Sequence, residues 1–167
     1  MRALAPLIFA IALTSCGATK QPAAIALTSS AFQNGQPIPV QYTCDGTNQT
    51  PPLNWSQPPS GTKSFALVID DPDAPGGTFR HLGVYDISPN ARSIAGGRQA
   101  TNDKGTLGYT GPCPPPGHGP HHYHFKLFAL DIDKLGLPSS AKIADVENAA
   151  ANHAIAQGEL IGTYGRR

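Results

Sequence analysis

The sequence predicts a mostly β, single-domain protein with a central β-sandwich or mixed sheet and one main helix near its C-terminal end. The chain has 167 residues, which is typical of one domain. Its 18 glycines and 17 prolines lie between short apolar runs and form no repeat. This pattern favours many strands and turns over a helical bundle. Residues 141–156 are instead rich in alanine and predict the helix.

The strands are expected wherever an apolar run lies between turn residues. Residues 64–70 (SFALVID) are the clearest case, because they are apolar on both faces, as a strand inside a sandwich or mixed sheet would be. The helix has a start signal at Pro138-Ser139-Ser140 and is expected to stop at Gly158. The other expected strands are residues 25–27, 40–43, 81–87, 123–130 and 159–164, with an extended segment at residues 51–55.

Residues 1–15 are typical of a lipoprotein signal peptide. Arg2 precedes an apolar run that is too short to cross a bilayer comfortably, and Leu13-Thr14-Ser15-Cys16 resembles a bacterial lipobox. We therefore expect lipid on Cys16, a tether over residues 16–24 and a folded domain over residues 25–167. An ordinary secretory peptide is the alternative. The residue after Cys16 is not Asp, which by analogy with enteric-type bacteria predicts the periplasmic side of the outer membrane.

Export also bears on the two remaining cysteines. Cys44 and Cys113 form an even pair in an oxidising compartment, which predicts one disulfide, with two buried thiols as the alternative. The absence of a CxxC motif argues against a thioredoxin-like or zinc-ribbon protein. The net charge of +1 and the lack of any lysine and arginine stripe argue against a nucleic-acid partner.

Two segments carry most of the polar chemistry. Residues 70–75 (DDPDAP) follow the clearest strand, and the two prolines make this loop stiff, although its carboxylates could simply cap the turn. In the strand that begins near His121, alternate residues share a face. His121 and Tyr123 therefore belong to the core face, whereas His122 and His124 are expected to be solvated. The histidines cannot all converge on one ion, so no metal site is predicted.

These motifs together resemble the phosphatidylethanolamine-binding protein family, in its bacterial Raf-kinase-inhibitor-like branch. The matching motifs, which span nearly all of the expected domain, are Asp71-Pro72-Asp73-Ala74-Pro75, His81 at the start of a strand, Gly111-Pro112-Cys113-Pro114-Pro115 and Gly119-Pro120-His121-His122-Tyr123. The resemblance implies a small anion-binding cavity. The residues expected to form it are Asp71, Asp73, Pro75, His81, Gly111, Pro112, Cys113, Pro114, His121 and Tyr123.

The chain departs from the family pattern at His122, where the family usually has arginine. If that arginine holds the cavity rim through the motif aspartates, the rim is weaker here or depends on pH. We expect Asp71 to orient His81 or His121 and to favour their protonated forms, so that phosphate binding strengthens from about pH 8 to about pH 6.

The expected function is binding rather than catalysis. The sequence contains neither a GxSxG motif nor a Walker loop, and no cofactor is predicted. The expected partners are a small phosphate-like anion, a membrane contacted through lipid on Cys16, and a second copy of the chain as a homodimer. The alternatives are an inhibitor or regulator of a protease or kinase, and a hydrolase that uses Cys113 or a histidine such as His121.

Overall fold

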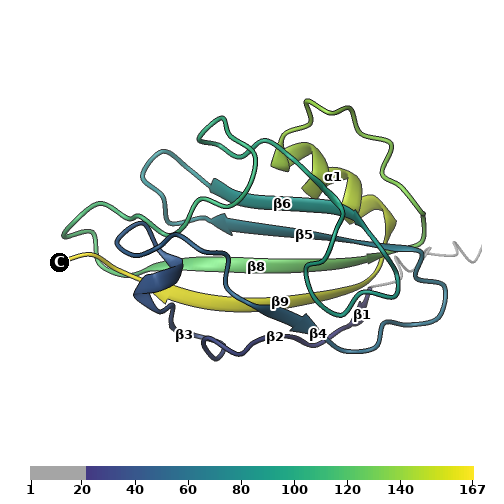
Figure 1. Cartoon of the computed structure of the whole chain (residues 1–167), viewed down its shortest axis with the longest axis horizontal. Helices are drawn as coiled ribbons and strands as arrows, with labels where there is room; N and C mark the ends of the chain where they lie inside the picture. Colours follow the sequence, from purple (N-terminus) through teal and green to yellow (C-terminus); the bar gives the residue numbers. More distant parts are fainter. Residues whose placement is uncertain (1–21) are drawn as a thin grey trace, which may run out of the picture.

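A seven-stranded sheet forms the centre of the molecule (Figure 1). The computed structural model describes residues 22–167. The strand order is β1-β9-β8-β5-β6-β7, with β3 also paired to β9, and a separate small sheet pairs β2 with β4. The elements are β1 (Ala23–Ala24), β2 (Leu27–Ser29), β3 (Gln36–Pro37), the 3-10 helix η1 (Val40–Tyr42), β4 (Leu53–Trp55), β5 (Ser64–Asp71), β6 (Phe79–Ile87), β7 (Arg98–Gln99), β8 (His121–Leu130), α1 (Ile143–His153) and β9 (Ala154–Tyr164).

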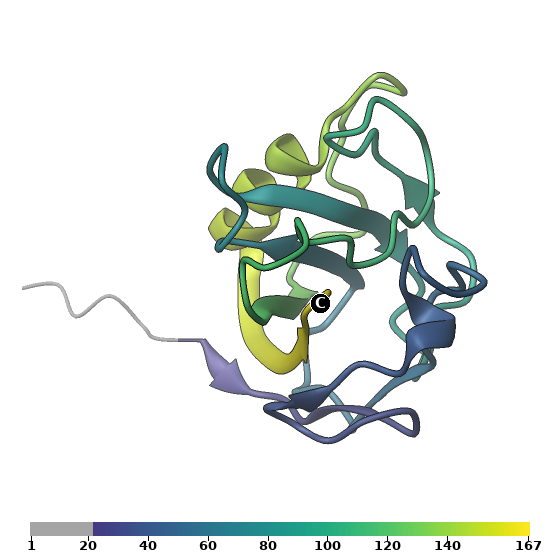
Figure 2. The same ribbon diagram turned by 90° about the vertical axis from the view of Figure 1, so that its left-hand side faces the viewer.

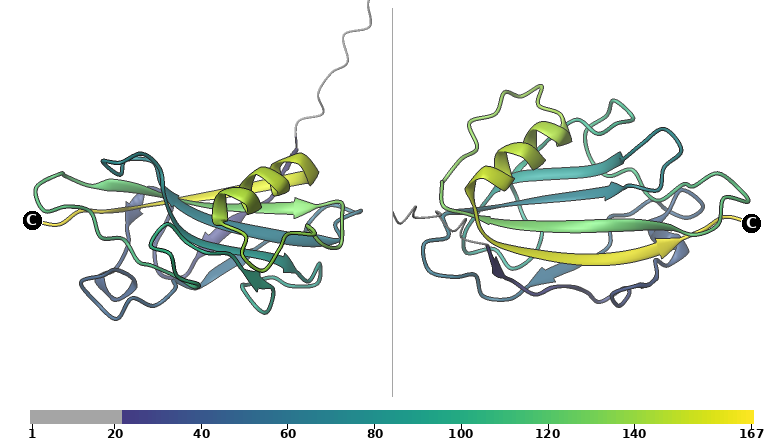
Figure 3. Two further views of the ribbon diagram at one scale, coloured as in Figure 1. Left: turned by 90° about the horizontal axis from the view of Figure 1, so that it is seen from above. Right: turned by 180° about the vertical axis from the view of Figure 1, so that it is seen from behind.

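The molecule is built in three layers. Figures 2 and 3 show α1 on one face of the large sheet and the N-terminal segments with the small sheet on the other. The central strand β5 is buried along its whole length, as its continuous apolar sequence predicts. Phe65, Leu67 and Ile69 join the larger core beneath the N-terminal segments, whereas Ala66 and Val68 face α1. The two-residue period of a strand therefore divides β5 between two cores.

Helix α1 packs closely on the sheet through one apolar stripe. Ile143, Val146 and Ala150 are fully buried, at the spacing that a single helix face requires. Gly83 of β6 lies directly beneath Ile143, and a Cβ atom at Gly83 would come within 2.8 Å of the isoleucine side chain. The missing side chain at Gly83 thus allows the helix to approach the sheet.

The structure confirms the main strands and corrects three local predictions. The strand expected at residues 25–27 is displaced to β2 at Leu27–Ser29, because pairing with β4 begins where Leu27 lies opposite Trp55. The strands predicted at residues 64–70, 81–87, 123–130 and 159–164 are present as β5, β6, β8 and β9, and each is longer than predicted. Residues 40–43 were expected to form a strand, but Val40–Tyr42 form the 3-10 helix. Its turn is closed by Tyr42 N–H donating to Pro39 O and Thr43 N–H donating to Val40 O, each at 2.9 Å.

The predicted helix is also shorter than its alanine-rich sequence suggests. It ends at His153 and not near Gly158, because the chain continues directly into β9 at Ala154. Ala154 pairs with Leu130 and Ala156 with Ala129, so hydrogen bonding to β8 replaces the helical pattern over these residues. Tertiary pairing here overrides the helix propensity of alanine.

The N-terminal predictions fall only partly within the structure. The signal peptide over residues 1–15 and the lipidation site at Cys16 lie outside the described residues. Ala23 and Ala24, expected to lie in the tether, form β1 and pair in parallel with Ala156 and Gln157 of β9. Within residues 22–167, no helix combines the length and apolar character that crossing a bilayer requires.

Candidate functional site

Sheet topology brings the predicted site residues to one end of the molecule. Strand β5 runs antiparallel to both β6 and β8, so the end of β5 lies beside the beginning of each neighbour. Asp71 is the last residue of β5, His81 is the third residue of β6 and His121 is the first residue of β8. Three segments that are distant in the sequence thus converge at the end of the sheet where the chain terminates (Figure 1).

These residues line a pocket of about 410 Å³. Its walls combine a few polar side chains with alanine, proline and phenylalanine, an arrangement typical of small-molecule sites. Of the ten predicted site residues, six line this pocket: Asp71, Pro75, His81, Cys113, Pro114 and His121. The remaining lining residues are Ala74, Phe79, Lys104, Thr110 and Pro115.

A buried aspartate–histidine pair lies in the pocket wall. Nδ1 of His121 is 2.8 Å from Oδ2 of Asp71, and both side chains are about 95% buried, with exposed fractions of 4% and 5%. The other oxygen of Asp71 accepts a hydrogen bond from the backbone N–H of Asp73 at 2.9 Å. Both carboxylate oxygens therefore have donors within the protein. Since Nδ1 of His121 faces Asp71, Nε2 is the ring nitrogen left for a ligand.

His81 has a different environment from His121. Its Nδ1 atom lies 2.5 Å from the carbonyl oxygen of Thr110, and only 4% of the residue is exposed. Its Nε2 atom is buried and has no hydrogen-bond partner among the described residues. Burial lowers the pKa of His81 below its ordinary value, although the hydrogen bond to Thr110 and the charge of Asp71 act in the opposite direction. The structure therefore argues against the protonated form of His81 that the sequence analysis had expected to be favoured.

Tyr123 supports the pocket from beneath and does not line it. Its ring packs edge-on against His81 with the ring centroids 5.3 Å apart, and the residue is fully buried. Its hydroxyl is buried near the carboxylate of Asp71. Burial, followed by the negative charge of Asp71, raises the pKa of this phenol, so it remains protonated at neutral pH.

Asp73 and His122 meet at the exposed rim. Oδ2 of Asp73 accepts a hydrogen bond from the His122 backbone N–H at 2.8 Å and lies 2.7 Å from Nδ1 of the same residue. The hydrogen bond from His122 is the main cause of the lowered pKa of Asp73. Asp73 is not among the pocket-lining residues. His122 thus contacts a motif aspartate from the position where the family pattern has arginine.

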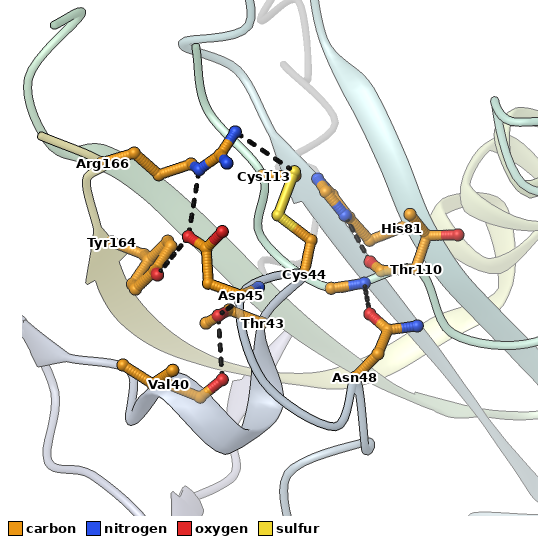
Figure 4. Close-up of a disulfide and its surroundings, with 11 residues drawn as sticks. Val40, Thr43, Cys44, Asp45, Asn48, His81, Thr110, Cys113, Tyr164 and Arg166 are labelled. Atoms are coloured by element: carbon orange, nitrogen blue, oxygen red, sulfur yellow. Dashed lines mark hydrogen bonds and ion pairs between the residues drawn. A yellow bond between two sulfur atoms is a disulfide. The ribbon is translucent and has the colours of Figure 1, made fainter. Parts of the chain in front are cut away.

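A disulfide holds the loop that forms one wall of the pocket. Cys44 and Cys113 are bonded, with their Cα atoms 5.4 Å apart (Figure 4). The backbone N–H of Gly111 also donates to Oδ1 of Asn48 at 2.7 Å, and a Cβ atom at Gly111 would lie only 2.6 Å from that oxygen. Gly111 and Pro112 therefore position the wall without lining the pocket themselves, whereas Cys113 reaches it.

Three lining residues, Phe79, Lys104 and Thr110, lie outside the motifs that the sequence analysis identified. Phe79 precedes His81 by two residues in β6, and their rings pack edge-on with the centroids 4.8 Å apart. Because alternate residues of a strand share a face, the sequence could have predicted that Phe79 lies beside His81. Lys104 and Thr110 lie in an irregular loop whose path has no such signal. This loop is organised by the buried Asn102, which accepts from the Lys104 backbone N–H and donates to the Thr110 hydroxyl, each at 3.1 Å.

The pocket contains little that would hold a metal ion. Within residues 22–167, no cluster of three or more histidine, cysteine, aspartate or glutamate side chains has a suitable arrangement. His122 and His124 point away from the core face and contact Asp73 and Glu159 respectively. The site is better suited to hydrogen bonding of a small polar ligand beside apolar walls.

The fold and this pocket agree with a match to a known family. The family model described as phosphatidylethanolamine-binding protein matches residues 28–165. The chain therefore belongs to the phosphatidylethanolamine-binding protein family.

Individual relatives support this assignment. A UPF0098 protein from Aquifex aeolicus is 48% identical over 148 residues, covering 83% of this chain and 86% of the relative. A Mycobacterium tuberculosis protein named "Putative lipoprotein LppC" is 45% identical over 161 residues, covering 92% and 79%. The crystal structure of Escherichia coli YbcL, described as a member of the mammalian PEBP family, has a TM-score of 0.82 at 33% identity and covers 87% of this chain and all of its own.

Proposed function

We propose that this protein is a non-enzymatic binding protein that holds a small phosphoryl anion at the end of its sheet. The observation that carries the proposal is the pocket itself, in which the Asp71–His121 pair, His81 and Lys104 line one space. Lys104 is the only lysine or arginine in this lining, and its ammonium group forms no ion pair with another described residue. It can therefore offset the charge of an incoming anion.

His121 provides a directed contact in this proposal. Asp71 holds Nδ1 of the ring, which leaves Nε2 to donate a hydrogen bond to the anion when the ring carries both protons. The carboxylate does not meet the ligand as a bare charge, because both its oxygens already accept hydrogen bonds. Stronger phosphate binding from about pH 8 to about pH 6 remains a prediction.

The structure argues against a hydrolase that uses Cys113 as its nucleophile. Cys113 is bonded to Cys44, so its sulfur is not available as a thiolate. No feature of the described residues favours inhibition of a protease or kinase over ligand binding. A homodimer likewise stays a prediction.

The relative named as a lipoprotein adds support to the proposed location. Together with the lipobox-like sequence before Cys16, it favours attachment to the bacterial envelope through lipid on that cysteine. The outer membrane, on the periplasmic side, remains the sequence-based prediction for the membrane involved.

The binding proposal is tested by comparing two histidines of β8 that lie on opposite faces. We expect His121→Ala to weaken inorganic phosphate binding by about tenfold or more, because a charge-assisted hydrogen bond contributes about 1.5–3 kcal/mol. His124→Ala, which removes a contact to Glu159 outside the pocket, should change affinity by less than about twofold. Isothermal titration calorimetry near pH 6.5 measures both.

A second variant separates binding from folding. His121→Ala leaves buried Asp71 without its partner, so thermal melting is recorded alongside. His121→Asn retains a donor near Asp71 but has no group at the position of Nε2, and it should also lose phosphate binding. Equal losses in the His121 and His124 variants, or phosphate binding that survives in His121→Asn, would count against the proposal.

A further inference from the structure

The ring of His81 presents an acceptor, not a donor, to whatever occupies the pocket. Its Nδ1 atom faces the carbonyl oxygen of Thr110, which can only accept a hydrogen bond, so Nδ1 carries the proton. In a neutral imidazole the other nitrogen then holds a lone pair. The low exposure of His81 disfavours a second proton on the ring.

This acceptor is left unsatisfied inside the site. Nε2 of His81 is buried without a hydrogen-bond partner among the described residues. Figure 4 shows it on the side of the ring that points away from Thr110. The rings of Phe79 and Tyr123 pack edge-on against His81 and keep it from turning freely. A buried acceptor without a partner costs about 1–3 kcal/mol, which a ligand that brings a donor recovers.

The charged and titratable groups near His81 do not supply that donor. Asp71 is an acceptor and already bonded, and the Tyr123 hydroxyl makes no contact with the ring nitrogen. Lys104 lines the same pocket and forms no hydrogen bond to His81. The remaining acids that act on the ring through space are Asp70 and Asp103.

We propose that the pocket selects phosphomonoesters over sulfate esters and phosphodiesters, because near neutral pH only a phosphomonoester retains a P–O–H group that can donate to Nε2 of His81, whereas the other two are fully ionised. This inference rests on the proposed anion-binding function and narrows its ligand class. The ionised oxygens of the same group meet the ammonium of Lys104 and Nε2 of His121. The pocket of about 410 Å³, with Phe79 and Pro75 among its apolar walls, leaves room for the ester substituent.

The test compares phenyl phosphate with phenyl sulfate, which have nearly the same shape but differ in the available proton. Near pH 6.5 an appreciable fraction of a phosphomonoester is singly protonated, because its second pKa is about 6. We expect the full-length protein to bind phenyl phosphate at least about tenfold more tightly than phenyl sulfate by calorimetry. Methyl phenyl phosphate, a diester that is fully ionised at this pH and therefore has no P–O–H group, should resemble the sulfate.

The His81→Asn variant tests whether Nε2 of His81 causes this selectivity. The asparagine amide can still donate to Thr110 but has no acceptor at the position of Nε2. In this variant the affinities for phenyl phosphate and phenyl sulfate should differ by less than about threefold, since the hydrogen bond to Nε2 is lost. His124→Asn, on the opposite face of β8, is the matched control and should keep the wild-type ratio.

Nuclear magnetic resonance provides a readout that does not depend on ligand affinity. The ¹⁵N shifts of the His81 ring in the free protein should show a neutral imidazole protonated at Nδ1. Equal binding of phenyl phosphate and phenyl sulfate, an unchanged ratio in His81→Asn, or a ring protonated at Nε2 would each overturn the inference while leaving anion binding intact. Failure of both esters and of inorganic phosphate to bind would overturn the proposed function as well.

Discussion

At the scale of single residues, the two pocket histidines show how environment divides one side-chain type into two roles. His121 faces a carboxylate at 2.8 Å, whereas His81 faces a backbone carbonyl and has no partner at its second nitrogen. The burial of His81 opposes a positive charge on its ring. The positions of the two histidines in the sequence, each near the start of a strand, give no hint of this difference.

The lowered pKa of His81 makes stability depend on pH. Because the unfolded chain binds a proton near pH 6.5 before the buried ring does, the contribution of neutral His81 is complete above that pH and is lost as the pH falls below it. One proton can change the free energy of unfolding by at most about 1.4 kcal/mol per pH unit. Urea denaturation at pH 7.5, 6.5 and 5.5 measures this loss. The slope should be smaller in His81→Asn, and an identical slope in both proteins would show that other groups cause it.

At the scale of elements, the pocket depends on a loop that has little regular structure of its own. The segment over residues 111–115 is held by the disulfide, by Asn48 and by the Cys44 backbone N–H, which donates to Pro112 O at 3.1 Å. These contacts fasten the wall to the segment that follows η1. The prolines restrict the loop, but the cross-links determine where it lies.

Removal of the disulfide should affect both stability and binding. The double variant Cys44→Ser with Cys113→Ser should lower the free energy of unfolding by about 2–4 kcal/mol, because the unfolded chain is no longer constrained over a separation of 69 residues. Phosphate affinity should also fall, since Cys113 lines the pocket. Guanidinium denaturation and calorimetry measure the two effects. Reduction of the wild-type protein should reproduce them, and an unchanged denaturation midpoint would contradict this role.

At the scale of the whole molecule, the beginning of β8, which contributes His121 to the pocket, and strand β1 lie at opposite ends of the sheet (Figure 1). His121 pairs with Tyr164 at the pocket end, whereas Ala129 pairs with Ala156, which also pairs with Ala23 of β1. The separation of eight residues along β8 corresponds to about 27 Å. The pocket therefore lies at the end of the sheet remote from Ala23, near which the described chain begins.

The anchor can be tested separately from the domain. If lipid on Cys16 attaches the protein to the membrane, as proposed, Cys16→Ser should move the protein from the membrane fraction to the soluble fraction. Thermal melting and phosphate affinity should stay unchanged, since the folded residues from Ala23 onward form the sheet and the pocket independently of that position. Membrane association that persists in this variant would show that another contact holds the protein.

The sequence predicted the strands that have a continuous apolar or an alternating pattern. It misassigned segments whose conformation depends on contacts with another part of the chain. Residues 64–70 are apolar throughout, and they form the strand that is buried on both faces. The alternation that placed His121 and Tyr123 on the core face is confirmed by their burial, while His122 is exposed. Val40–Tyr42 and Ala154–Ala156 were assigned wrongly because proline-bounded turn geometry and pairing with β8 outweigh local propensity.

By itself, the sequence determined the β-rich class, the family and the identity of most pocket residues, because periodic burial and motif spacing are local properties. Only the tertiary structure decided how those residues meet: the antiparallel arrangement of β5 with β6 and β8 brings Asp71, His81 and His121 together. It also decided that Lys104 enters the pocket while Asp73 remains at the rim. The physical reason is that hydrogen-bond partners and burial, which set the charge and the donor or acceptor role of each group, come from segments that are distant in the chain.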